Sequence, residues 1–581
     1  MSENEFIFSL KNVSYTHDGK DTPALKNITL NIRRGTLVMI VGPSGSGKST
    51  LCDILAGVNP HINGGYLEGE VFIDGIETRQ AKEGETCLKV GKIFQDAEVM
   101  FSAMEVEDEI AFGPENRAVP TAGIAETVDH CLEFADLTQL RHNLVWELSG
   151  GQAQRLGIAA ILAMQTPVII MDEPTANLDP KATRFVHDMA LRLRDEGHTI
   201  ILVTKESDEM LEQADEIIVL DDGRVLCVGR PQAVINEMGD FISEKLGIWL
   251  PEVTEIGLGL RQQKLWTVPD IPLNIDTALA GMLGRIEFRP GPAPAEAAAA
   301  DRGGPDRSSI VTARDICYYY PGNRIAVKGI SFDICRGDFL AIVGRNGAGK
   351  STLSKMLVGL QKPQQGSLEM FGKNAKAWNV ADLSRKIALV FQNPEHQFLT
   401  DSVFDEIAYT LKSKTNGAVA PAELQAAVDR VLKMLELEDV AQDHPFSLSA
   451  GKKRRLGVAA MLVGSPEVLV VDEPTYGQDK KMTNSLIHLM LQLRDMGITI
   501  IMITHNMRLV QEYAERVIVM SEGLITFDGY PGKLFGSREL LEQANLSVTS
   551  LQVLVEQLRE RSVPVPGSVK SVNGFLNALK V

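Results

Sequence analysis

The chain has little cysteine and no long apolar run, and each shortage excludes a class of protein. Its 581 residues include six cysteines, and no two of them form a C-x-x-C pair. A metal cluster or a disulfide framework is therefore not expected, and the thiols are expected to be reduced. No apolar run reaches the ~18 residues that a membrane-crossing helix needs.

The chain also lacks an excess of positive charge. It has 58 Lys and Arg against 76 Asp and Glu, which gives a formal net charge of −18. A protein that binds nucleic acid by itself usually carries a basic patch, so nucleic acid is not an expected partner. The acidic first residues, Met1–Glu5, do not resemble a secretory signal. These observations predict a protein in the cytosol, or one held on a membrane by a partner.

A glycine-rich phosphate-binding loop occurs twice in the sequence. Each copy follows a short apolar run and precedes a helix-like segment, so that its backbone N–H groups can surround a phosphate at a helix N-terminus. Lys48 and Lys350 are expected to reach the β- and γ-phosphates of a nucleotide. The predicted ATP-binding residues of the two loops are Gly42, Pro43, Ser44, Gly45, Ser46, Gly47, Lys48, Ser49, Thr50, Gly344, Arg345, Asn346, Gly347, Ala348, Gly349, Lys350, Ser351 and Thr352.

The repeat extends well beyond these loops. The two loop lysines are 302 positions apart, Gln95 and Gln392 are 297 apart, and Asp172 and Asp472 are 300 apart. A chain of this length needs more than one core, and the spacing predicts two copies of one domain. The predicted parts are a first nucleotide-binding domain over 1–246, an accessory tail over 247–288, a Pro/Ala/Gly linker over 289–309, a second nucleotide-binding domain over 310–535 and a C-terminal tail over 536–581.

Continuous apolar runs indicate the fold class. They cover residues 168–171 and 199–203 in the first half and 468–471 and 499–503 in the second, and a helical pattern over 182–196 separates the first two. Short apolar runs alternating with helices are typical of parallel strands in an α/β sheet. The phosphate loop then lies at the carboxyl ends of the strands, where such sheets bind ligands.

Each half has two adjacent acids at the end of an apolar run. Asp172 and Glu173 precede Pro-Thr, and so do Asp472 and Glu473. The first acid of each pair can hold Mg²⁺, and the second can polarise an attacking water. A strand that ends in acids as it enters solvent would give the same local pattern. Together with the serine after each loop lysine, the predicted Mg²⁺ ligands are Ser49, Asp172, Ser351 and Asp472.

A third motif is Leu148–Gln152, repeated as Leu448–Lys452. A serine followed by small residues before a helix-like run makes an anion-binding helix start. With a phosphate loop before it and a carboxylate strand after it, the pattern resembles the ATP-binding cassette (ABC) ATPases over nearly all of both halves. The resemblance implies two tandem P-loop ABC ATPase domains with helical subdomains, and ATP and Mg²⁺ as cofactors. It also implies that the signature loops are Ser149, Gly150, Gly151, Gln152, Ser449, Ala450, Gly451 and Lys452.

The resemblance assigns roles to four polar positions outside these motifs. Gln95 and Gln392 match the glutamine that contacts Mg²⁺ and senses the transport partner, which adds them to the expected Mg²⁺ ligands. Asp179 and Asp479 match the aspartate that links the two ATP sites.

The resemblance also implies the catalytic and adenine-contacting residues. Glu473 and Glu173 match the catalytic glutamate, and His505 matches the switch histidine that contacts the γ-phosphate. Tyr320 matches the aromatic residue that stacks on adenine, and His17 takes that place in the first half. A packed strand residue is the alternative interpretation of Tyr320.

ABC ATPases of this kind close head to tail, so the resemblance implies an intramolecular ATP sandwich in which each ATP lies between the phosphate loop of one half and the signature loop of the other. The site that contains Lys350 matches the family at every position. The site that contains Lys48 has Lys205 and Ala450 where a histidine and a glycine are expected. Lysine only donates hydrogen bonds, whereas neutral histidine can also accept one. Unequal hydrolysis is expected, with sequence drift in a tolerant family as the alternative.

Several segments resemble the ATPase subunits of energy-coupling factor (ECF) importers, notably Glu109–Asn116, Phe391–Phe398 and Tyr476–Asp479. In that group, two ATPases drive an integral membrane scaffold and a substrate-binding membrane subunit, usually for a vitamin or a transition-metal ion. The resemblance implies a peripheral location at the cytoplasmic face of the cell membrane. A fused sugar-importer ATPase stays open as an alternative. A twin-cassette translation factor fits less well, because the Pro/Ala linker is not a long charged helix.

Partner contacts are expected in the segments that follow the two glutamines, Ala97–Ala111 and Pro394–Ala408. Both carry apolar residues, among them Met100 and Phe398, which could line a groove for a short helix of a membrane partner. Burial in the core of the same domain is the competing interpretation of these residues.

Overall fold

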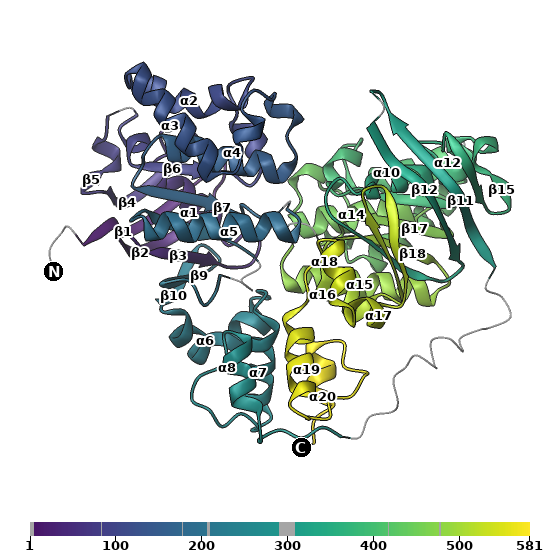
Figure 1. The fold of residues 1–581 in the computed structure, drawn as a ribbon. Helices are drawn as coiled ribbons and strands as arrows, with labels where there is room; N and C mark the ends of the chain where they lie inside the picture. The colour runs from purple at the N-terminus through teal and green to yellow at the C-terminus, as the bar shows by residue number, and fades with distance from the viewer. Residues whose placement is uncertain are drawn as a thin grey trace. The chain divides into compact units, whose positions relative to one another are not determined.

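The structure, a computed structural model, describes residues 5–82, 84–176, 178–205, 210–289, 308–322, 324–415, 417–475 and 478–580. The chain forms two compact units, Met1–Leu283 and Gly284–Val581 (Figure 1). Within the described ranges, no helix is both long and apolar enough to cross a membrane.

The first unit is built on a six-stranded sheet of order β10-β9-β3-β8-β7-β6. All neighbouring strands are parallel except β9 and β10. Strands β3, β7 and β8 are buried along their whole length, as expected for a parallel sheet covered on both faces. The strands are β3 (Leu37–Val41), β6 (Val90–Ile93), β7 (Val168–Asp172), β8 (Thr199–Val203), β9 (Glu216–Asp221) and β10 (Arg224–Gly229).

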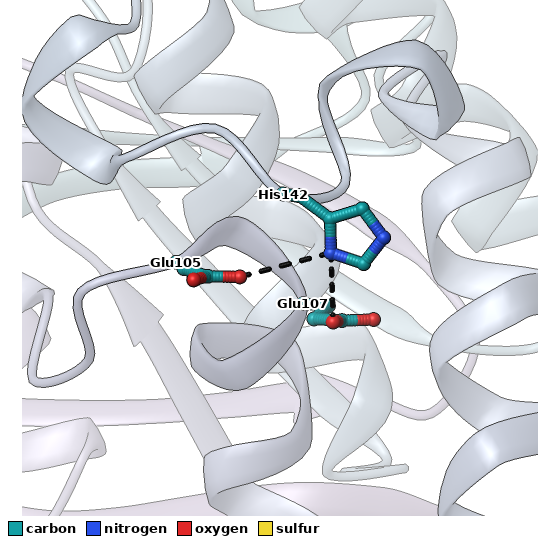
Figure 2. Close-up of side chains that lie close together, drawn as sticks. All are labelled: Glu105, Glu107 and His142. Carbon is teal, nitrogen blue, oxygen red and sulfur yellow. Dashed lines mark ion pairs between the residues drawn. The ribbon is translucent and has the colours of Figure 1, made fainter.

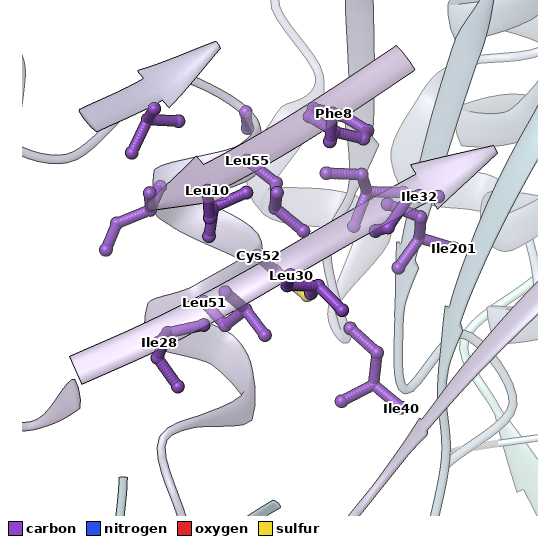
Figure 3. Close-up of a cluster of buried hydrophobic side chains, with 14 of the residues drawn as sticks. Phe8, Leu10, Ile28, Leu30, Ile32, Ile40, Leu51, Cys52, Leu55 and Ile201 are labelled. Atoms are coloured by element: carbon purple, nitrogen blue, oxygen red, sulfur yellow. The ribbon is translucent and has the colours of Figure 1, made fainter. Parts of the chain in front are cut away.

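A second sheet of order β2-β1-β4-β5 is antiparallel and encloses the main core. The core lies between this sheet, helix α1 and the central sheet, where Leu10, Ile28, Leu51 and Ile40 come together (Figure 3). Burial of such side chains contributes about 1.5–3 kcal/mol each and fixes α1, and with it the phosphate loop, against the sheet. The elements are β1 (Phe6–Thr16), β2 (Leu25–Arg33), β4 (Tyr66–Ile73), β5 (Ile76–Glu77) and α1 (Lys48–Leu55).

Three helices that pack on one another form the helical subdomain of the first unit, and a fourth helix packs on β8. A short 3₁₀ turn, η3, packs on α4 and connects this subdomain to the end of β6. The elements are η3 (Ala97–Met100), α2 (Val106–Asn116), α3 (Thr121–Phe134), α4 (Gly150–Ala163) and α5 (Pro180–Asp195).

The second unit repeats this architecture, with sheets of order β16-β17-β18-β13-β19-β20 and β12-β11-β14-β15. The predicted α/β class, with tandem domains, mostly parallel central sheets and helical subdomains, is confirmed. The elements are β11 (Ser309–Tyr320), β12 (Arg324–Cys335), β13 (Phe339–Val343), α10 (Lys350–Leu357), β14 (Gln365–Met370), β15 (Lys373–Asn374), α11 (Val380–Ser384), β16 (Ile387–Val390), η8 (Pro394–Gln397), α12 (Val403–Lys414), α13 (Pro421–Met434), α14 (Ala450–Leu462), β17 (Val468–Asp472), α15 (Lys480–Asp495), β18 (Thr499–Ile503), α16 (Met507–Tyr513), β19 (Arg516–Ser521) and β20 (Leu524–Gly529).

Each unit ends in a set of short helices. The accessory tail predicted to run to residue 288 is divided between the units: the first ends at Leu283, and Phe288 forms a β-bridge with Leu579 and a ring contact with Phe575 in the second. Residues 290–307 of the predicted linker lie outside the described residues. The tail helices are α6 (Pro231–Asp240), η6 (Phe241–Lys245), α7 (Glu252–Gln262), α8 (Ile275–Met282), α17 (Pro531–Phe535), α18 (Arg538–Gln543), α19 (Ser550–Glu560) and α20 (Val572–Asn577).

Candidate functional site

Both glycine-rich loops connect a buried strand to a helix, as predicted. The first joins β3 to α1 and the second joins β13 to α10. Lys48 Nζ donates hydrogen bonds to the carbonyl oxygens of Gly42 and Pro43, at 2.7 and 2.8 Å. Lys350 Nζ bonds Gly344 O in the same way, at 2.6 Å. Each loop therefore curls around its own ammonium group, in the geometry of an anion-binding cradle.

Two features of the first loop explain why it needs glycine. A Cβ on Gly42 would lie 2.4 Å from the carbonyl oxygen of Leu220 in β9, which leaves no room for a side chain. Gly47, the N-cap of α1, has a φ of 98°, a left-handed conformation that glycine adopts without strain. Gly223, in the β9–β10 hairpin, donates a backbone hydrogen bond to Ser46 O at 3.0 Å. The central sheet therefore supports the loop directly.

The two predicted aromatic positions reach equivalent atoms of the two loops. His17 Nε2 lies 3.2 Å from Thr50 Oγ1, and the Tyr320 hydroxyl lies 3.2 Å from Thr352 Oγ1. Tyr15 is fully buried in the first half, where its hydroxyl donates to Gly64 O at 2.7 Å. His17 is therefore the counterpart of Tyr320 in space, and the contact of either ring with adenine stays a prediction.

The acidic pair of the first half lies beside its phosphate loop. Asp172 ends β7, and Ser49 Oγ lies 3.4 Å from Asp172 Oδ1 although the two residues are 123 positions apart. A hydroxyl and a carboxylate oxygen are ligands that Mg²⁺ accepts, and the ion supplies positive charge to a bound triphosphate. The oxygen atoms of Ser49 and Asp172 thus fit the predicted magnesium site.

Both catalytic candidates adopt the left-handed backbone conformation. The φ angle is 50° at Glu173 and 44° at Glu473. Each backbone N–H is bound by the last carbonyl of the neighbouring strand, Val203 O at 3.0 Å and Ile503 O at 2.8 Å. Such strained residues cluster at functional sites, where the surrounding structure holds them in place. The same backbone conformation and hydrogen bond therefore position both glutamates.

The second-half glutamate is held by a histidine and a hydroxyl. His505 Nδ1 lies 2.9 Å from Glu473 Oε1, and Thr504 Oγ1 donates to Glu473 Oε2 at 3.2 Å. Burial works to raise the pKa of Glu473, but the charge and hydrogen bond of His505, the Lys350 charge and the Thr504 hydrogen bond together hold the pKa below its usual range. Burial and the adjacent Glu473 charge raise the pKa of Asp472 to about 6. A buried, ionised glutamate beside a polar ring can orient a water for attack on a phosphate.

The first-half glutamate is held by a lysine instead. Lys205 Nζ lies 2.8 Å from Glu173 Oε1 and 3.0 Å from Oε2, so one ammonium group engages both carboxylate oxygens. The predicted departure from histidine thus has a structural consequence, because the oxygens that would polarise water already accept from Lys205. Glu206, which follows it, lies outside the described residues.

The sequence reasoning missed a second lysine of the first half. Lys92, in β6, forms an ion pair with Asp53 of α1, and its Nζ also lies 3.6 Å from Asp172 Oδ2. Only 7% of its side chain is exposed. A lysine within the otherwise apolar run of β6 was the available signal, but the sequence could not say which acid it meets.

The signature loops begin the third helix of each subdomain. Ser149 is the N-cap of α4, and its N–H donates to Gln152 Oε1 at 2.8 Å in a capping box. Ser449 caps α14, but Lys452 cannot complete such a box and pairs with Asp439 at 2.6 Å. The side chain of Ala450, together with Tyr476 and Gly477 of the ECF-like segment, lies outside the described residues.

The remaining polar candidates occupy equivalent loops. Asp179 Oδ1 accepts from Ala182 N and Asp479 Oδ1 from Met482 N, both at 2.9 Å, so each aspartate is a helix N-cap. Gln95 and Gln392 follow β6 and β16; Gln95 is half-buried and Gln392 is exposed. Their contacts with Mg²⁺ and with a partner stay predictions.

The segments expected to contact a partner contain both core and surface residues. Phe398 is 7% exposed and packs edge-on against Phe446, so the core interpretation holds for it. The neighbouring Leu399 is 70% exposed. In the first half, Met104 and Trp146 are exposed, and they lie near each other because Val145 N donates to Met104 O at 2.9 Å. Exposed apolar side chains therefore occur in both units: Met104 and Trp146 form the first apolar patch, and Leu399 and Phe446 form the second.

The rim of the first patch carries an ionic cluster at the start of α2. His142 Nδ1 lies 3.0 Å from Glu107 Oε1 and 3.7 Å from Glu105 Oε2 (Figure 2). Arg141 Nε already donates to Glu107 at 2.7 Å. Acids in the first turn of a helix are stabilised by its dipole, which accounts for the cluster without a bound ion.

Comparisons with known proteins show what this chain is similar to. A family model described as ABC transporter matches residues 25–176 and 327–476. A Methanosarcina mazei protein, provisionally named an ABC transporter ATP-binding protein, is 36% identical over 100% of this chain and 98% of its own length. A Bacillus subtilis protein, YkoD, provisionally named an HMP/thiamine import ATP-binding protein, is 34% identical over 94% of this chain and 95% of its own length. The solved structure of cbiO1 from Clostridium perfringens, described as part of the ABC transporter complex cbiONQ, is 32% identical and covers 43% of this chain and 99% of that chain, with a TM-score of 0.38.

Proposed function

This chain belongs to the ABC transporter family and is an ATP-hydrolysing subunit of that family. We propose that it powers an ECF-type importer of a micronutrient such as a vitamin or a transition-metal ion. The observation that carries the proposal is the fusion of two nucleotide-binding units whose catalytic glutamates are held differently, by His505 in one and by Lys205 in the other. Two unlike units on one chain fit an importer whose membrane scaffold is asymmetric.

The cargo class rests on resemblance and on one relative. YkoD, named for HMP/thiamine import, aligns over nearly the whole of this chain. The segment Phe391–Phe398 is similar to ECF importer ATPases. A fused ATPase of a sugar importer is the second candidate. Affinity purification from membranes tests the choice: co-purification of a small substrate-binding membrane protein supports the ECF type, and capture of a soluble sugar-binding protein contradicts it.

ATP is proposed to bind with Mg²⁺ in a sandwich formed within one chain. Each unit carries a phosphate loop and a signature loop, and a tether raises the effective concentration of one unit at the other. In this arrangement the loop of Lys350 meets the helix start of Ser149. Scattering of the Glu473→Gln variant should show an ATP-driven compaction of a monomer. ATP-driven dimers of the full chain, without compaction, would contradict the sandwich.

We place the protein at the cytoplasmic face of the cell membrane, bound to membrane subunits through the two apolar patches. Trp146 and Leu399 are exposed members of these patches, and the segments that follow the two glutamines contain Met104 and Leu399. Burying such side chains under a partner helix is favourable, and a charge placed there opposes it. ATP-driven closure could then move the partner.

Substitution of the patch residues tests the docking proposal. Trp146→Glu and Leu399→Glu should each release the chain from membranes and leave nucleotide binding intact. Met496→Glu is the matched control, because Met496 is equally exposed but follows α15, away from both glutamine loops in the sequence. Retention of both patch variants on membranes, with unchanged cargo uptake, would show that the docking surface lies elsewhere.

A further inference from the structure

The residues just before the predicted linker are bound by the C-terminal tail of the second unit. Phe288 and Leu579 form an antiparallel β-bridge. Two backbone hydrogen bonds of 2.8 Å flank this bridge, from Arg289 N to Ala578 O and from Lys580 N to Glu287 O. We call residues 286–289 together with residues 575–580 the terminal clip.

Side-chain packing reinforces the terminal clip. The Phe288 ring stands edge-on to the Phe575 ring, with 5.1 Å between the ring centres and 88° between the ring planes. Phe288, Phe575 and Leu579 are all buried. Burial of one such side chain contributes about 1.5–3 kcal/mol. The ion pair between Lys580 and Glu287 is exposed and therefore contributes little.

The terminal clip bears on the role of residues 290–307, which the sequence predicts as the linker between the two units. Both residues that flank this stretch make backbone hydrogen bonds within the second unit. Arg289 bonds the C-terminal tail, and Ser308 O accepts at 3.3 Å from Arg336 N, which follows β12. While the clip is closed, the stretch therefore starts and ends in the same unit.

The covalent connection between the units is then much shorter than the predicted linker. The first unit ends at Leu283, and Glu287 is the first residue whose backbone bonds the C-terminal tail. The three residues 284–286 span at most roughly 11 Å. With the clip open, the connection would run over about 25 residues, from 284 to 308. Effective concentration falls roughly as the −3/2 power of tether length, so opening the clip should lower it about tenfold or more.

We propose that the terminal clip, and not the Pro/Ala/Gly stretch, sets the length of the tether between the two nucleotide-binding units. The C-terminal tail holds the chain that arrives from the first unit and keeps residues 290–307 out of the tether. The effect on ATP rests on the proposed function, because a short tether favours closure of a sandwich within one chain.

The same insertion at two places tests this proposal. A Gly/Ser segment of about 60 residues is inserted into the Glu473→Gln chain, either between Leu283 and Gly284 or within 290–307. Scattering then gives the ATP concentration at half-maximal compaction. The insertion after Leu283 should raise that concentration about tenfold or more, and the insertion within 290–307 should leave it unchanged. Equal effects of the two insertions would overturn the proposal.

Opening the clip should bring residues 290–307 into the tether. Phe288→Ser should by itself raise the half-maximal ATP concentration about tenfold, and the insertion within 290–307 should then raise it about fivefold further. Glu287→Gln removes only the exposed ion pair and is the matched control, with no expected change. A Phe288→Ser chain that stays insensitive to this insertion would contradict the role of the clip.

Amide hydrogen exchange without nucleotide measures the clip apart from the sandwich. Peptides that cover 287–289 and 578–580 should be protected in the unaltered chain and should lose protection in Phe288→Ser. Rapid exchange of both peptides in the unaltered chain would overturn the clip. Protection that depends on Phe288, in a chain that ATP does not compact, would support the clip and overturn only the ATP sandwich of the proposed function.

Discussion

In the second half, Glu473 is held by His505 and Thr504; in the first, Lys205 engages both oxygens of Glu173. The backbones around the two glutamates match, down to the positive φ angle and the hydrogen bond to the neighbouring strand. The comparison teaches that the shared sheet positions the acid in the same way in both halves, whereas the side chain after the next strand, which contacts the carboxylate, differs between them.

The largest expected effect concerns the ion pair that only the first half has. Lys92→Leu leaves the buried Asp172 and the half-buried Asp53 without this cation, which should lower the free energy of unfolding of the first unit by about 3 kcal/mol. The double change Lys92→Leu/Asp53→Leu removes both charges and should recover most of that loss. Thermal unfolding of the full chain measures both variants. A double variant as unstable as the single one would argue against the pair as the cause.

The next effect compares the two glutamates directly. Glu473→Gln should lower ATP turnover by ~10²-fold or more, because the water loses its polarising carboxylate. That loss corresponds to about 2.7 kcal/mol of transition-state stabilisation. Glu173→Gln should cost much less, because Lys205 already occupies that carboxylate. Steady-state ATP hydrolysis is measured with the membrane partners present. Equal losses of turnover in the two variants would contradict the expected difference between the two glutamates.

A rescue experiment sharpens the role of the switch residue. In the Glu473→Gln chain, Lys205→His should replace the lysine contact of Glu173 by the histidine contact of the second half and raise the residual hydrolysis about tenfold, a modest part of what a positioned base supplies. Lys205→Arg keeps the positive charge and should give no rescue. If Lys205→His and Lys205→Arg give the same residual hydrolysis, Lys205 is not the cause of the low hydrolysis expected at the first site.

The smallest effect concerns the signature helices. Ser149→Ala should cost about 1 kcal/mol of stability, because it breaks a reciprocal capping box with Gln152. Ser449→Ala should cost about half as much, because Lys452 pairs with Asp439 and returns no bond to the cap. Nucleotide-free thermal unfolding compares the two variants. Equal shifts would show that the capping box adds nothing.

Much of the fold could be predicted from local sequence. The buried strands β7, β8, β17 and β18 lie where continuous apolar runs place them. The phosphate loops, the acidic pairs and the aromatic positions could be found because each depends on residues close together in the chain or on the internal repeat.

The sequence by itself therefore determined the architecture, the duplication and the residue types of both sites, since turn glycines, strand periodicity and helix caps act over a few positions. Only the tertiary structure decided which charges meet. The register between β6 and β7 brings Lys92 to Asp172, and the ends of β7 and β8 bring Lys205 to Glu173. It also decided that Phe398 is buried while Leu399 is exposed. A buried ion pair is strong only within a few ångströms, and that distance is fixed by how separate strands pack rather than by any one of them.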